Sequence, residues 1–211
     1  TLSCYQRKVI AYSYVSRKKK KIQKEDIIPL DVYSKKRVEL RTNIINFKKN
    51  RKISLGPYAT FYFENYETML AQLQEMLYFE KDDYDQLKEE LSPYNALIPN
   101  GKQLTASLIF EIDNPISRAD FLGKIGGIEE KVFMKINDEI IKAVPEEDVV
   151  KTSEEKKTSL LQFIHFNFTD NQIEKFKSNI SKIELGIDHK DYSHSTKLSK
   201  ENISSLSADF S

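Results

Sequence analysis

A strand that turns directly into an amphipathic helix constrains the fold of this chain more than any other feature. The stretch ATFYFENYETMLAQLQEML (59–77) opens with closely spaced aromatic residues, and Asn65 then stands where a helix N-cap belongs. Beyond it, apolar side chains at spacings of three and four form one stripe, made of Tyr66, Met69, Leu70, Leu73, Met76 and Leu77. We expect this stripe, with Phe61 and Phe63, to pack against strands at 103–112 and 158–168.

Other apolar runs predict the remaining strands, and amphipathic runs between them predict helices. Strands are expected at 52–57, 58–63, 103–112, 131–136, 140–144, 158–168 and 182–188. Helices are expected within 24–52 (capped by Asp31), at about 66–91, at 115–125 and at 170–180, with a loop at 92–101 and a polar tail after 188 that ends in a weak helix. The fold class that follows is α+β: a mixed or antiparallel sheet of about six strands, with a long helix and shorter helices packed on it.

The distribution of charge suggests where the domain begins. Residues 1–22 are basic and lack apolar periodicity, so we expect them to lie outside the fold and residues 23–211 to form a single α+β domain. Residues 1–57 hold 16 Lys and Arg against 4 Asp and Glu. A basic arm can bind nucleic acid, but few aromatic residues stand among these cations to stack on bases. We therefore do not expect nucleic acid as a partner.

The sequence also bears on the compartment. No apolar run approaches the roughly 18 residues that span a bilayer. At the start of the chain the charges follow a weak apolar stretch, the reverse of the order in a secretory signal. The single cysteine, Cys4, excludes an internal disulfide framework and a multi-cysteine metal site. We expect a cytoplasmic protein with no membrane partner.

Three carboxylates stand among residues that favour burial. Glu64 ends the strand before the Asn65 cap, while Glu67 and Glu75 lie on flanks of the predicted helix. Carboxylates near a helix N-terminus gain from its dipole, which explains Glu67 and part of Glu64 but not Glu75. Buried carboxylates need partners, either cationic or metallic. They are therefore either satisfied structural groups or parts of a ligand or metal site.

The histidines offer partners for these carboxylates. His165 lies within the apolar strand FIHFNF, and His189 and His194 flank Tyr192 in the polar segment GIDHKDYSH. A histidine on a core strand is usually hydrogen-bonded and structural, whereas His and carboxylate groups together suit divalent iron, manganese or zinc. We expect GIDHKDYSH to close a polar pocket over Glu64, Glu67 and Glu75, with Tyr192 as a further ligand-binding residue.

Several long strings of the chain resemble those of a known bacterial family. The sequence lacks a P-loop, a dinucleotide-binding fingerprint, an HExxH helix and a nucleophile elbow. The strings are ATFYFENYETMLAQLQEML, YNALIPNGKQLTASLIFEID, GGIEEKVFMKI, AVPEEDVVKT, QFIHFNFT and LGIDHKDYSH. They resemble the proteins grouped as domain of unknown function 3501, from about Gln23 to Phe210.

The resemblance implies a cellular context and no established chemistry. Genes of this family tend to stand beside those for rubrerythrin and for iron–sulfur oxidoreductase subunits, which makes such proteins possible partners and implies redox or peroxide-stress physiology. Two functions are therefore expected as alternatives. One is an accessory or binding protein without turnover of its own. The other is a metal-binding protein or metalloenzyme that uses a Glu/His site.

Overall fold

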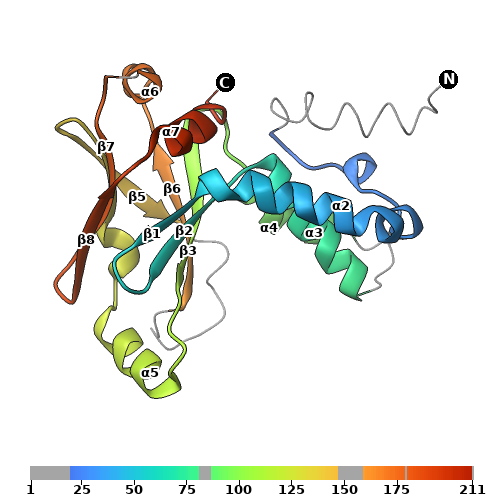
Figure 1. The fold of residues 1–211 in the computed structure, drawn as a ribbon, viewed down its shortest axis with the longest axis horizontal. Coiled ribbons are helices and arrows are strands. Elements are labelled where there is room, and N and C mark those ends of the chain that lie inside the picture. The colour runs from blue at the N-terminus through green and yellow to red at the C-terminus, as the bar shows by residue number, and fades with distance from the viewer. Residues whose placement is uncertain (1–19, 81–86, 147–158, 179, 211) are drawn as a thin grey trace.

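The fold is a strongly curved antiparallel sheet with a helical arm projecting from it, and it is described from a computed structural model (Figure 1). The described residues are 20–80, 87–146, 159–178 and 180–210. The strands are β1 (Lys52–Leu55), β2 (Ala59–Glu64), β3 (Gln103–Phe110), β4 (Val132–Ile136), β5 (Glu139–Pro145), β6 (Leu161–Asn167), β7 (Ile183–His189) and β8 (Tyr192–Lys197). The α-helices are α2 (Leu30–Lys48), α3 (Tyr66–Glu80), α4 (Leu87–Ala96), α5 (Pro115–Lys124), α6 (Asp170–Lys177) and α7 (Lys200–Ser207).

The eight strands form one sheet in the order β1-β2-β3-β6-β5-β4-β7-β8, and every neighbouring pair is antiparallel. The α+β class is thereby confirmed, but the expected count of about six strands is too low. The prediction lacked β8, which has exposed side chains over Ser193–Ser195 and therefore shows no apolar alternation. The sheet curls until its two edge strands come close, and Tyr192 of β8 bonds the carbonyl of Leu55 on β1.

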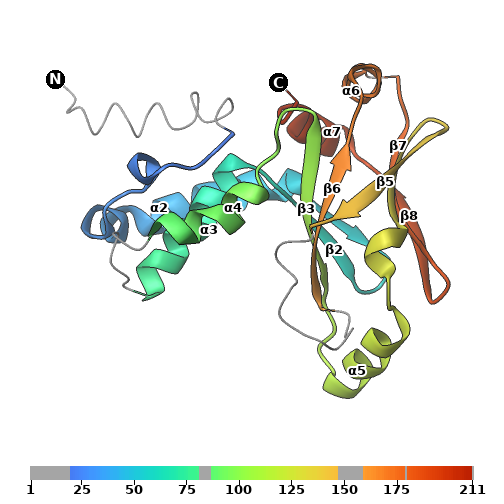
Figure 2. The ribbon, with the colours of Figure 1, turned by 180° about the vertical axis from the view of Figure 1, so that it is seen from behind.

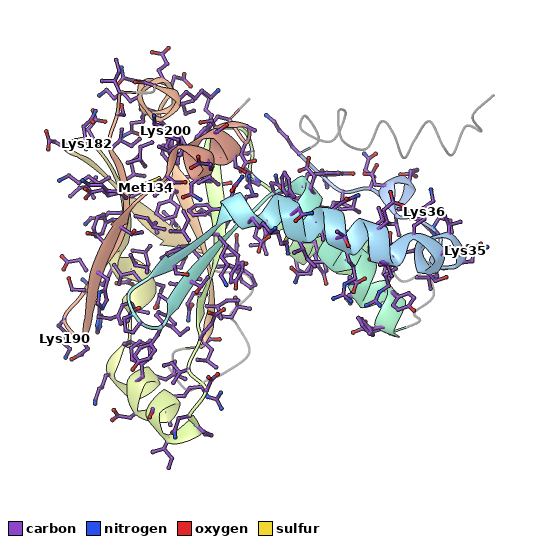
Figure 3. All side chains as sticks on the ribbon, viewed as in Figure 1. Lys35, Lys36, Met134, Lys182, Lys190 and Lys200 are labelled. Carbon is purple, nitrogen blue, oxygen red and sulfur yellow. The ribbon has the colours of Figure 1, made fainter. Side chains whose placement is uncertain are left out.

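The main core lies on the concave side of the curled sheet. Alternate residues of each strand point into it, among them Phe61, Leu108, Met134 and Phe166. Figure 3 shows Met134 within the sheet region, whereas Lys35 and Lys36 lie out on the arm. An aromatic cluster of Phe168, Phe176 and Phe210 brings α6 and the C-terminal end of the chain onto this core.

A second, smaller core holds the arm together. Helices α2 and α3 lie side by side, α4 packs against α3 on the rear side in the view of Figure 1, and all three extend away from the sheet (Figures 1 and 2). The stripe expected on α3 is buried, as predicted, but it packs with Ile22, Ile27, Leu97 and Ile98. Of the predicted partner strands only Phe163 reaches this cluster. The expectation that the whole stripe lies on strands β3 and β6 is therefore wrong, because α4 and the chain before α2 cover it.

The ends of the helices follow their capping residues. Asn114 caps α5 and Thr169 caps α6, each through its own side chain. The cap of α2 is Pro29, so Asp31, the expected cap, lies in the first turn. Helix α4 continues through Pro93 to Ala96, which corrects the loop expected from residue 92. The segment 81–86 lies outside the described residues, so continuity between α3 and α4 stays a prediction.

The fold begins before residue 23. Ile22 is buried in the arm core, and its backbone N–H donates to Asn95 Oδ1 at 2.7 Å. The boundary expected after residue 22 is therefore too late. Residues 1–19 lie outside the described residues, and the expectation that they do not join the fold stays a prediction. Within the described part of the chain, no helix has the length and apolar character needed to cross a membrane.

Candidate functional site

A buried ion pair joins the arm, the sheet and the C-terminal helix. Arg51 directly precedes β1, and its side chain is 1% exposed. Its Nε donates to the carbonyl of Phe63 at 2.9 Å, and Nη2 donates to the carbonyl of Glu64 at 3.3 Å and to Asp209 Oδ2 at 2.5 Å. Its Nη1 donates to the carbonyl of Ser205 at 3.2 Å. Because the guanidinium is matched by acceptors from three segments, it fixes α7 against the end of β2.

The Asp209 side chain is as buried as its partner, with 5% exposed. Burial raises the pKa of Asp209 above its ordinary value, although Arg51 and a hydrogen bond from Asn65 act in the opposite direction. The Asn65 side chain also accepts the backbone N–H of Thr68 and so caps α3, as the sequence predicts. Asn65 therefore connects the start of α3 to the Arg51–Asp209 pair.

An open pocket of about 540 Å³, called the junction pocket below, lies above this pair. Helix α7 supplies one wall with Lys200, Glu201 and Ser204, and the end of α2 supplies another with Asn46, Phe47 and Asn50. The remaining lining comes from Lys20, Arg51, Asn65, Tyr66, Glu67, Ile98, Pro99, Ser205, Ala208 and Asp209. The lining contains as many cationic as anionic side chains, together with three amides and three hydroxyls. The arrangement can bind a small polar molecule that carries both donors and acceptors.

A row of polar side chains crosses the convex face of the sheet beside the arm. Glu64 pairs in register with Thr105, Thr105 with His165, and His165 with Val144. Since register partners share a face, the Glu64, Thr105 and His165 side chains lie side by side, opposite the main core. All three are buried, and Ser107 lies two positions along β3 on the same face.

Hydrogen bonds connect most of this row. His165 Nδ1 lies 3.0 Å from Thr105 Oγ1, and His165 Nε2 lies 2.7 Å from Glu146 Oε2. Ser107 Oγ donates to Glu64 Oε1 at 2.9 Å. The other carboxylate oxygen, Glu64 Oε2, is buried and has no hydrogen-bond partner in the part of the chain that the structure describes. A hydroxyl, an imidazole and a carboxylate in sequence resemble a nucleophile relay, but Thr105 is fully buried.

The structure separates the residues that were expected to form one pocket. Glu75 lies on the arm, where it accepts hydrogen bonds from Tyr33 at 2.6 Å and from Arg37 Nε and Nη2 at 2.8 Å each. The Arg37 hydrogen bonds lower the pKa of Glu75 below its ordinary value. Glu67 lines the junction pocket, and Glu64 belongs to the polar row. The three carboxylates thus lie in three separate places and do not form one site.

Tyr192, His189 and His194 lie away from these carboxylates. The Tyr192 hydroxyl accepts the backbone N–H of Ala59, the first residue of β2, whereas Glu64 is the last residue of that strand. Five residues of extended chain separate Ala59 from Glu64 by about 16 Å. The buried His189 accepts a hydrogen bond at Nδ1 from the backbone of Asp191, and the exposed His194 packs on the Tyr192 ring. The pocket expected between GIDHKDYSH and the carboxylates is therefore not formed. Only His165 and Glu64 share a row.

Tyr192 instead bridges the two edges of the sheet. Its hydroxyl donates to the carbonyl of Leu55 and accepts the N–H groups of Tyr58 at 3.1 Å and Ala59 at 2.9 Å. Burial raises the pKa of this phenol. Gly56, with φ +62°, allows the close approach, because a Cβ there would lie 2.7 Å from the Tyr192 hydroxyl. All hydroxyl contacts are thus to backbone groups of the β1–β2 turn.

The sequence reasoning missed the residues that organise both regions. Arg51 lies in a basic run that reads as a solvated helix end, and Asp209 lies in the polar tail, so neither pattern indicates burial. Thr105 and Ser107 alternate with Leu104, Ala106 and Leu108, and this alternation is a signal for a polar row on one face of a strand. Among the described residues, no group of three or more His, Cys, Asp and Glu side chains is close enough to hold a metal ion.

Comparison with known proteins supports the fold and gives no activity. A family model described as "Protein of unknown function (DUF3501)" matches residues 21–210. A crystal structure of a novel protein of unknown function from Burkholderia pseudomallei is similar, with a TM-score of 0.85 and 30% identity, covering 90% of this chain and 100% of that one. No curated protein matches the chain.

Proposed function

The chain belongs to the family described as "Protein of unknown function (DUF3501)", and on that premise we propose that it is a binding protein without turnover of its own. Its ligand is a small zwitterionic molecule held in the junction pocket above Arg51 and Asp209. The observation that carries this proposal is the balanced lining of that pocket, where cations, anions, amides and hydroxyls surround about 540 Å³.

The rim and the floor of the pocket have different roles. The Arg51 guanidinium and the Asp209 carboxylate are matched to each other and to backbone groups, so they form a rigid base. Besides this pair, the lining carries two further cations, Lys20 and Lys200, and two further anions, Glu67 and Glu201. A molecule with one ammonium and one carboxylate group matches such a rim better than a simple anion does.

The buried relay argues for binding over catalysis. Thr105 would be its nucleophile, and its side chain is fully buried. A nucleophile has to reach the reacting atom of a substrate at about 3 Å, and a hydroxyl in this position cannot do so. The relay therefore supports a structural role for these groups, in line with the expectation of an accessory protein.

We place this binding role in redox or peroxide-stress physiology, beside a rubrerythrin-type or iron–sulfur oxidoreductase system, in the cytoplasm. The family resemblance is the support for that context. Exposed apolar side chains on the arm, Val38, Ile45 and Phe79, add a surface for a protein partner.

The alternative, iron, manganese or zinc at a Glu/His site, has less support from the geometry. Both ring nitrogens of His165 already have partners within the protein, at Thr105 and Glu146. A nitrogen in a hydrogen bond to carboxylate or hydroxyl must leave it before it can ligate a metal. Elemental analysis of the protein purified without a histidine tag tests this alternative, and stoichiometric iron, manganese or zinc would favour it.

Calorimetric titration tests the pocket with three probes of different charge. L-Glutamine is zwitterionic, inorganic phosphate is anionic and glycerol is neutral. We expect L-glutamine to bind at a single site and the other two to bind at least tenfold more weakly. Ser204→Trp, which fills the pocket from α7, should abolish that binding, whereas Ser117→Trp on the exposed surface of α5 should preserve it. Equal binding by both variants, or no preference among the probes, would contradict the proposal.

A further inference from the structure

The polar row on the convex face of the sheet has more oxygen lone pairs than the hydrogen-bond donors of the described residues satisfy. We propose that Glu64 Oε2, Thr105 Oγ1 and Ser107 Oγ together bind one monovalent metal cation, Na⁺ or K⁺. The side chains come from two neighbouring strands, with Glu64 directly opposite Thr105 and Ser107 bonded to Glu64 at 2.9 Å. This site is separate from the junction pocket and independent of the function proposed for it.

The hydrogen bonds of the row determine which oxygens remain available. The Glu146 carboxylate can only accept, so His165 Nε2 carries the proton of their 2.7 Å bond. In the neutral imidazole Nδ1 is then an acceptor, and Thr105 donates its hydroxyl proton to it. Ser107 likewise donates its proton to Glu64 Oε1. Both hydroxyl protons are therefore used, and both hydroxyl oxygens retain lone pairs.

Glu64 Oε2 is the third electron-rich atom and the one that requires a ligand. Glu64 is 4% exposed, and this oxygen has no hydrogen-bond partner among the described residues. A buried carboxylate oxygen without a partner loses its solvation without compensation, so native proteins supply a partner for it. Arg51 does not compensate it, because its guanidinium bonds the backbone carbonyl of Glu64 and is paired with Asp209.

The donor set selects the class of ligand. One carboxylate and two hydroxyls are hard oxygen ligands, which suit alkali and alkaline-earth ions and not zinc or iron. The site carries a single formal negative charge, because Glu146 is committed to His165. One monovalent cation neutralises that charge, whereas a divalent ion would leave an uncompensated positive charge in a buried place.

Thermal unfolding of the full chain in different chloride salts tests the proposal. At equal ionic strength we expect Tm to be about 2–4 °C higher in NaCl or KCl than in tetramethylammonium chloride, whose cation is too large to enter. The rise should saturate with concentration, as binding to one site requires. An equal Tm in all three salts would overturn the proposal.

Two variants on the same face of the sheet assign the effect to Glu64. Glu64→Gln should remove the difference between the salts. Glu111→Gln should retain it, because both oxygens of Glu111 already accept hydrogen bonds, from Thr60 at 3.1 Å and from Tyr62 at 3.0 Å. A salt difference that survives in Glu64→Gln would contradict the assignment.

Diffraction from the unaltered protein keeps the test valid if Glu64→Gln fails to fold. Crystals grown in thallium(I) acetate should show an anomalous peak bonded to Glu64 Oε2, since Tl⁺ replaces K⁺ in oxygen sites. Electron density for a bound water without anomalous signal would show that water alone satisfies this oxygen, and the proposal would be wrong.

Discussion

Arg51 and Glu64 are neighbouring buried charges that the protein compensates in different ways. The Arg51 guanidinium meets a carboxylate and three carbonyls, so every part of it is matched within the chain. Within the described ranges, the Glu64 carboxylate has one hydroxyl partner, at Oε1, and none at Oε2. At the scale of the residue, Arg51 is a structural ion-pair partner, whereas Glu64 needs a ligand.

Removal of the Arg51–Asp209 ion pair should destabilise the fold strongly. Arg51→Met leaves Asp209 buried without its counter-ion, and breaking a buried pair in this way typically costs about 3–5 kcal/mol. Urea unfolding should show this loss, and the double variant Arg51→Met/Asp209→Leu should recover a large part of it, because no charge is then left unpaired. A double variant that is less stable than Arg51→Met would contradict this view of the pair.

Glu75 gives the arm a predictable pH response. Its pKa is lowered in the folded state by Arg37, so the unfolded chain binds this proton more readily. The stabilising contribution of Glu75 is therefore present above its unfolded pKa, about 4.3, and is lost as pH falls through its lower folded value. Glu75→Gln should reduce the fall in Tm between pH 5 and pH 3, measured by circular dichroism. An unchanged acid slope in the variant would show that the ion pair is energetically silent.

At the scale of the element, β8 holds the curved sheet nearly closed. The Tyr192 hydroxyl forms hydrogen bonds with three backbone groups at the β1–β2 turn, those of Leu55, Tyr58 and Ala59. Strand β8 itself carries polar residues, so its place in the sheet depends on Tyr192 and on pairing with β7.

Tyr192→Phe tests this closure. The variant keeps the ring among its aromatic neighbours but leaves the Ala59 and Tyr58 N–H groups unpaired, a change that costs about 1–3 kcal/mol. Hydrogen exchange should show faster exchange of these two amides, while amides of β3 and β6 change only with global stability. If the Ala59 amide keeps its protection, the hydroxyl is not what closes the sheet.

Sequence patterns predicted elements whose signal is local and missed those whose signal is not. The seven strands with apolar runs were found, and so was the Asn65 cap, because each depends on adjacent residues. Strand β8 and the Arg51–Asp209 pair were missed. When a polar residue is buried by a partner more than 150 positions away, the local sequence shows no apolar periodicity that would indicate its burial. The pocket expected between GIDHKDYSH and the three carboxylates was wrong for the same reason, because the order of strands in the sheet decides which strand ends lie together.

At the scale of the whole molecule, two hydrophobic cores meet across a polar layer. The concave core belongs to the sheet and the smaller core to the arm, and Phe163 contacts the arm core from the convex face. The buried row of Glu64, Thr105 and His165 lies on that same face.

Leu73→Ala probes the smaller core. Leu73 is fully buried in the arm cluster, and truncation of a buried leucine typically costs about 2–5 kcal/mol. Because the arm has its own core, we expect hydrogen exchange to rise most in α2 and α3 and least in β4 and β7. A uniform rise across the protein would show that the arm and the sheet unfold as a single unit.

The measurement that tests the central claim most directly is a chemical-shift map of the isotope-labelled protein titrated with L-glutamine. If the junction pocket is the binding site, the largest amide shifts should occur at its lining, in residues Asn46, Asn50, Asn65, Glu67 and Glu201. They should saturate together with the calorimetric titration, and they should vanish in Ser204→Trp. Shifts confined to other surfaces, or no saturable shift at all, would contradict the claim that this pocket is where the protein binds its ligand.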